Sequence, residues 1–161
     1  MTWNLLAIPL LARISLVILF PFSGLDKIVH WDDAMKQADS SFLRGGALLL
    51  VAAIIIEFVT PVCIVLAWHG RLAAFVLALF CVVTAILYHP FWKFPGFWSG
   101  NNIVGRNHFW DFLKNFGLVG GLLLVIAGGA LVPASTILRH PLSTAPFSAT
   151  SKTSIAHRRS P

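Results

Sequence analysis

Four long apolar stretches, separated by short polar segments with glycine or proline, set the pattern of the chain. They cover residues 4–22, 47–68, 71–88 and 111–132. A helix that crosses a bilayer needs roughly 20 mostly apolar residues, so each stretch is long enough to span a membrane. The pattern predicts an all-α integral membrane protein built as a four-helix bundle.

The segments between the spans predict further elements. Residues 26–38 place Ile28, Trp31, Met35 and Ala38 at three- and four-residue spacing, which is typical of a short interfacial helix. Residues 89–110 combine dense aromatic residues with glycines and prolines, which predicts an irregular aromatic belt at the membrane surface. Pro21 is expected to kink or end the first span, and Pro61 to kink the second.

Composition agrees with a membrane protein. The chain has 161 residues, 57% of them hydrophobic and only 11% charged, with a mean hydropathy of +0.81. A soluble domain usually has about 25% charged residues. We expect one membrane domain over residues 1–132 and a disordered basic tail, rich in Ser, Thr and Pro, over residues 133–161.

The net charge of +6 comes mainly from loops and the tail, which suits contact with lipid rather than with nucleic acid. The first apolar run lacks a basic leader and an Ala-x-Ala site, so we interpret it as a retained helix. Four spans put both termini on one side, which we expect to be the cytoplasm because the basic tail suits anionic lipid.

Two charged residues lie within apolar runs, Arg13 in the first span and Glu57 in the second. An ionisable group in the middle of a membrane helix costs at least about 2.5 kcal/mol on insertion scales unless it is paired, protonated or near water. The two spans run antiparallel and place the two charges at similar depths, so we predict an Arg13–Glu57 ion pair. The pair could be a structural staple or a proton or ligand site, and the staple is favoured.

A second group of polar residues is expected at the opposite face, where spans one and three end and span four begins. Its members are Ser23, Asp26, Lys27, His30, His89, Asp111, Lys114 and Asn115. With aromatic walls from residues 89–110, such a pocket would suit a quinone-like ring or a small anion. The alternative is ordinary interfacial placement, with the lysine side chains reaching toward water and Asp111 near a helix N-terminus.

Other chemistries have little support in the sequence. Cys63 and Cys81 lie in apolar runs without a C-x-x-C motif, so we interpret both as small buried residues. The sequence predicts neither a metal site nor a haem site, because none of the histidines lies in the middle of a span. Gly117 and Gly121 form a small-xxx-small face that would let another helix approach, within the chain or in a homo-oligomer.

The polar residues also occur within an ordered set of short motifs. In chain order these are Arg13, Phe22-Ser23-Gly24-Leu25-Asp26-Lys27-Ile28, Glu57, Gly70-Arg71-Leu72-Ala73-Ala74, Tyr88-His89-Pro90-Phe91-Trp92, and Phe112-Leu113-Lys114-Asn115 followed by Gly117, Gly120 and Gly121. Over about residues 10–130 this set resembles the DoxX family of small four-helix bacterial membrane proteins. The resemblance implies a location in the inner membrane and a link to redox systems, because the family takes its name from a subunit associated with thiosulfate:quinone oxidoreductase. It marks Arg13, Ser23, Lys27, Glu57, His89, Lys114 and Asn115.

Three functions remain open at this stage. The leading hypothesis is a non-autonomous membrane subunit that works with a soluble or membrane redox protein and contacts a quinone. The first alternative is a membrane anchor or scaffold without catalysis, in which the charged residues only set the packing. The second alternative is a pathway for a small solute or protons, which would require an oligomer because four helices leave little room for a gated path.

Overall fold

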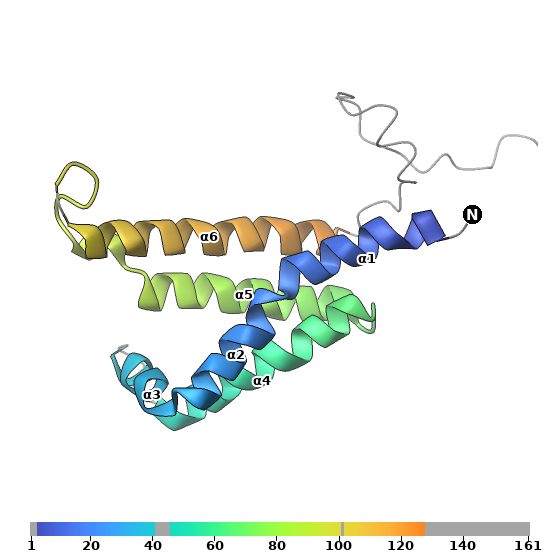
Figure 1. The fold of residues 1–161 in the computed structure, drawn as a ribbon, viewed down its shortest axis with the longest axis horizontal. Coiled ribbons are helices and arrows are strands. Elements are labelled where there is room, and N and C mark those ends of the chain that lie inside the picture. The colour runs from blue at the N-terminus through green and yellow to red at the C-terminus, as the bar shows by residue number, and fades with distance from the viewer. Residues whose placement is uncertain (1–2, 41–45, 101, 128–161) are drawn as a thin grey trace, which may run out of the picture.

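The structure is a computed structural model, and it describes residues 3–40, 46–100 and 102–127 (Figure 1). These residues form six α-helices and one 3-10 turn, with no β-strand among them. The elements are α1 (Trp3–Val17), α2 (Leu19–Val29), α3 (Trp31–Asp39), α4 (Gly46–Val65), α5 (Gly70–Tyr88), η1 (Phe91–Lys93) and α6 (Ile103–Ile126). The predicted tail, residues 133–161, lies outside the described residues.

Four stretches of the described chain are helical, long and apolar enough to cross a membrane, which confirms the predicted all-α four-span bundle. The first span is longer than predicted and runs over Ala7–Val29. It is built from α1 and α2, which meet at a bend at Ile18 (Figure 1). Pro21 explains the bend, because proline has no N–H to donate to the Val17 carbonyl and its ring clashes with that group. The helix then resumes instead of ending.

Helices α4 and α5 form the predicted antiparallel hairpin. Residues 66–69 connect them, and Ala67 and His69 adopt positive φ angles of 55° and 50° in this short turn. Pro61 lies inside α4 without interrupting it. Helix α4 therefore continues through Pro61, the position at which a kink was predicted.

Two predicted boundaries shift. Helix α3 begins at Trp31, and Asp26 to Val29 belong to α2. Helix α6 begins at Ile103, eight residues before the predicted start at Asp111. The Asn102 side chain caps it by accepting a hydrogen bond from the Gly105 N–H at 3.0 Å. Asp111 consequently lies within α6 and is not near a helix N-terminus.

Helix α5 is central, because α4 packs on one side of it and α6 on another. Small residues make this contact close, and Ala74, Cys81 and Ala85 on α5 are fully buried. Cys63 on α4 is also buried, and both cysteines are free thiols in the core. This confirms their interpretation as small buried residues.

The first span contacts the rest of the bundle at two levels. At the α1 level, Gly121 of α6 lets Leu16 approach so closely that an added Cβ would lie 2.6 Å from Leu16 Cδ1. After the bend, α2 packs along α4 and diverges from α6 (Figure 1). The bundle is therefore a wedge that widens toward the end where α3 lies.

Candidate functional site

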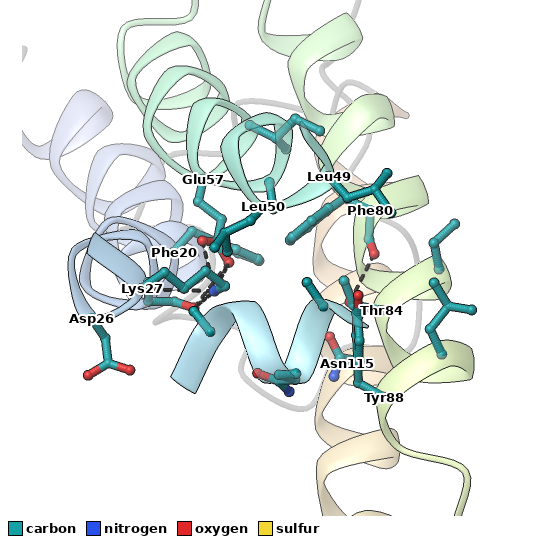
Figure 2. A pocket seen from close by; sticks show the side chains of 18 of the residues that line it. Phe20, Asp26, Lys27, Leu49, Leu50, Glu57, Phe80, Thr84, Tyr88 and Asn115 are labelled. Atoms are coloured by element: carbon teal, nitrogen blue, oxygen red, sulfur yellow. Dashed lines mark hydrogen bonds and ion pairs between the residues drawn. The ribbon is translucent and has the colours of Figure 1, made fainter. Parts of the chain in front are cut away.

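The widening side of the wedge contains a cavity of about 680 Å³, lined by residues from α2, α3, α4, α5 and α6 together with His89 (Figure 2). The cavity brings together all eight residues that were predicted to form a polar group, and adds Glu57. These eight are Ser23, Asp26, Lys27, His30, His89, Asp111, Lys114 and Asn115. Arg13 does not line the cavity.

One polar group in the cavity joins α2 to α4, and we call Ser23, Lys27 and Glu57 the α2–α4 triad. Lys27 Nζ lies 2.8 and 2.9 Å from the two Glu57 carboxylate oxygens and 2.6 Å from Ser23 Oγ. Ser23 Oγ in turn donates to Glu57 Oε1 at 3.0 Å (Figure 2). The three protons of the ammonium thus have three close acceptors within the triad.

The triad is buried in the bundle. The Glu57 side chain is 4% exposed and that of Lys27 is 22% exposed. Lysines near helix ends usually extend toward the membrane surface. Lys27 instead extends inward, because its ammonium contacts Ser23, one helical turn closer to the middle of the span.

The predicted Arg13–Glu57 pair is wrong, because the partner of Glu57 is Lys27. Gly24 lies level with Glu57, since a Cβ added at Gly24 would be 3.4 Å from the Glu57 Cβ. Arg13 precedes Gly24 by eleven positions, which is about 16 Å along a helix. Arg13 makes no hydrogen bond or ion pair within the described residues. The prediction failed because it ended the first span at Phe22, before Lys27.

Gly24 also sets the distance between α2 and α4. A Cβ at this position would lie 2.8 Å from Phe58 Cε2, closer than real side-chain contacts. The absence of a side chain thus lets α2 approach α4 closely enough for Ser23 and Lys27 to reach Glu57. The spacing of Ser23 and Lys27, one helical turn apart and beside a glycine, is the sequence signal that could have identified the triad.

The second polar group lies across the cavity, and we call His89, Asp111, Lys114 and Asn115 the α5–α6 cluster. Lys114 Nζ lies 2.9 Å from Asp111 Oδ1, and Asn115 Nδ2 donates to the Asp111 carbonyl at 2.9 Å. His89 Nδ1 lies 3.9 Å from Asp111 Oδ2. Since Lys114 has three N–H groups and the Asn115 amide has two, each keeps at least one donor beyond these contacts.

One further histidine, His108, contacts the α5–α6 cluster. His108 Nδ1 lies 3.5 Å from His89 Nδ1, and its ring stacks on Phe94 with centroids 5.0 Å apart. His30 pairs with Asp26 at 2.9 Å, and both side chains are exposed. Asp26 points away from the triad (Figure 2). His108 does not line the cavity and contacts the predicted pocket only through His89.

The predicted aromatic walls from residues 89–110 are wrong. Phe91 packs instead against Trp92, Phe97, Phe109 and Phe112, with ring centroids 5.2–5.3 Å apart. Gly105 lets this segment lie against α6, since its added Cβ would be 2.6 Å from the Phe94 Cβ. The aromatic residues therefore form their own cluster beside α6, and the aromatic side chains that line the cavity are Phe20, Phe80 and Tyr88.

The remaining cavity wall is largely apolar, from leucines, alanines and Ile56 of α4 and from Val83 and Leu87 of α5. Four carboxylates and two lysines line the cavity, and both lysines are paired with one of these carboxylates. The described residues hold no group of three or more His, Cys, Asp or Glu placed to bind a metal ion. The arrangement can bind an apolar molecule whose polar end accepts hydrogen bonds.

Comparisons with known proteins agree with this architecture. The DoxX family profile matches residues 8–90 of the chain, which include the α2–α4 triad and His89. The inner membrane protein YphA of Escherichia coli (strain K12) is 28% identical over 120 residues, covering 74% of this chain and 81% of YphA. No solved structure matches the chain.

Proposed function

The chain belongs to the DoxX family of integral inner-membrane proteins, and from this premise we propose that it is a subunit of a redox system that binds a quinone in the cavity. The observation that carries the proposal is the combination of an apolar wall with unused hydrogen-bond donors in one space. The volume of about 680 Å³ falls within the range of roughly 300–1,000 Å³ found for sites of small organic ligands. A quinone has a flat apolar ring and two carbonyl oxygens that only accept hydrogen bonds.

The charges of the lining favour a neutral ligand. With four carboxylates and two paired lysines, the cavity offers no unpaired cation to an anion. A small anion or a phosphate group would have to compete with Glu57 or Asp111 for a lysine that is already paired. Of the two ligands predicted from the sequence, a quinone-like ring and a small anion, this favours the quinone.

The two polar groups have different tasks in this proposal. The α2–α4 triad satisfies its own donors and acceptors, so it provides a rigid wall rather than a hydrogen bond to the ligand. The α5–α6 cluster retains N–H groups on Lys114 and Asn115, and His89 adds a ring nitrogen that lines the same space. We assign ligand recognition to this cluster.

A partner supplies the electrons. Reduction of a quinone to a quinol consumes two electrons and two protons, and the redox link that the family resemblance implies would make a soluble or membrane redox protein the electron donor. Such a partner would meet the bundle at the end where α3 and the cavity lie. In this proposal the termini remain on the cytoplasmic side.

The test is quinone binding by the full chain in lipid nanodiscs, with a short-chain quinone as the probe and extraction of any quinone that co-purifies. The variant Asn115→Leu removes one neutral hydrogen bond, worth about 1 kcal/mol, and should lower the affinity about fivefold. Asn107→Leu is the matched control, because Asn107 is an exposed asparagine of α6 that does not line the cavity.

Two outcomes of this binding experiment would contradict the proposal. If no quinone co-purifies and the probe does not bind saturably, the redox proposal is overturned and the anchor or scaffold hypothesis takes its place. If the Asn115→Leu and Asn107→Leu variants both bind the quinone as tightly as the wild type does, the α5–α6 cluster is not the recognition site.

A further inference from the structure

The first span leaves the cavity unenclosed on one side. Helix α2 packs on α4, and α6 packs on α5, but α2 and α6 share no extensive packing along the described chain. Figure 1 shows α2 diverging from α6 beyond the bend at Ile18. We call the space between these two helices the α2–α6 opening. Leu19 lines the cavity and yet is 57% exposed, so an apolar side chain of a membrane span lies accessible at this opening.

The walls of the opening change from polar to apolar along the helix axes. On α6 the lining residues run from Asp111 through Lys114 to Leu118, about 10 Å along the helix. On α2 they run from Lys27 through Ser23 to Leu19, about 12 Å along the helix. The polar end lies toward the membrane surface where α3 lies, and the apolar end lies toward the middle of the bilayer.

The two axial ends of the cavity differ, because the end toward the middle of the bilayer is covered and the polar end remains partly exposed. Toward the middle of the bilayer, Leu16 of α1 fills the space over Gly121, and Phe20 and Leu122 are buried below it. At the other end, α3 contributes Ala34, Gln37 and Ala38 to the lining. The polar end is lined by exposed charged side chains, so the apolar part of a long molecule is better accommodated sideways, through the opening, in the lipid.

We propose that the ligand enters laterally from the bilayer between α2 and α6 and that it is an amphiphile with one apolar tail. Its head lies beside the α5–α6 cluster, and its tail leaves the protein against Leu19 and Leu118. This inference rests on the proposed function for the identity of the head, and adds the route and the tail. The polarity of the opening runs in the same direction as that of a lipid leaflet, so such a molecule can enter without turning over.

The test compares two leucine variants of α2. Leu19→Trp places a bulky ring in the opening, whereas Leu25→Trp makes the same change at a leucine that is 50% exposed but does not line the cavity. The probes are a quinone with a ten-carbon tail and the same ring without a tail, titrated into the full chain in nanodiscs. Leu19→Trp should weaken binding of the tailed quinone at least tenfold and that of the tailless ring less than twofold, and Leu25→Trp should change neither.

A second measurement does not depend on the quinone ring. Phosphatidylcholine with a diazirine in the acyl chain, photolysed in the same nanodiscs, should label Leu19 and Leu118 more strongly than Leu72 and Phe75. The latter two are exposed on α5 and do not line the cavity. A thermal unfolding curve for each variant shows that it is folded.

The outcomes separate the two proposals. If the tailed and tailless quinones both bind but the two tryptophan variants are indistinguishable, lateral entry is overturned and quinone binding stands. If neither quinone binds the wild type, the proposed function fails, and enriched lipid labelling at Leu19 and Leu118 would support the opening as an acyl-chain site. Equal labelling of all four residues would overturn the proposed lateral entry, whether or not a quinone binds.

Discussion

The cavity contains two lysine–carboxylate pairs of nearly equal length in different surroundings. Lys27 and Glu57 are 2.8 Å apart with side chains 22% and 4% exposed, whereas Lys114 and Asp111 are 2.9 Å apart with side chains 72% and 41% exposed. Distance therefore does not distinguish them, and burial does. The buried carboxylate has lost its water and depends on its partners. The exposed pair keeps most of its solvent and can exchange a partner for a ligand.

The largest effect is expected when the buried pair is broken. Lys27→Met leaves the Glu57 carboxylate buried without its cation, and removal of one partner of a buried pair typically costs about 3–5 kcal/mol. We expect the free energy of unfolding in detergent to fall by about this amount. The double variant Lys27→Met/Glu57→Leu removes both charges and should recover most of the loss.

Arg13 gives the matched control for this experiment. Arg13→Met also removes an intramembrane cation, but Arg13 has no ion-pair partner within the described residues, so its effect should be much smaller than that of Lys27→Met. If Arg13→Met is the more damaging variant, or if the double variant is no more stable than Lys27→Met, the triad does not hold α2 on α4 in the manner proposed.

A moderate effect is expected at the glycine that brings α2 to α4. Gly24→Val adds atoms where even a Cβ would lie 2.8 Å from Phe58, and such overpacking usually costs about 1–3 kcal/mol. The same change at Gly117, where an added Cβ would meet no atom within 4 Å, is the control. Thermal unfolding should show a lower midpoint for Gly24→Val than for Gly117→Val, and equal midpoints would exclude close packing at Gly24.

The four-span fold could be predicted from sequence because the length of each apolar stretch is set by the thickness of the bilayer. The gathering of Ser23, Lys27, His89, Asp111 and Asn115 also followed from topology, since helix ends on the same face of a membrane meet at one level. Neither argument needs the positions of individual side chains.

Predicting which residue pairs with Glu57 did require the positions of individual side chains. The prediction for Glu57 ended the first span at Phe22 and left open whether Pro21 kinks or ends the helix, although proline only removes one hydrogen bond and the helix can resume beyond it. Gly24 then places α2 beside Glu57, which depends on a packing distance that spacing alone does not reveal. The prediction that aromatic residues line the cavity failed for a similar reason, because Phe91 and its aromatic neighbours pack against one another and not against the cavity.

The smallest effect on stability, and the sharpest contrast with the triad, is expected at the exposed pair. Lys114→Met removes a surface ion pair, which is typically worth about 0–1 kcal/mol, so the unfolding midpoint should hardly change. Because Lys114 holds spare donors at the cavity, the same variant should lower quinone affinity about two- to fivefold. Lys36→Met provides the control, since Lys36 forms a similar exposed pair with Asp33 at 2.8 Å but does not line the cavity. A Lys114 variant that unfolds as readily as Lys27→Met, or that binds quinone as well as Lys36→Met, would remove the distinction between a pair that supports the fold and one that serves the ligand.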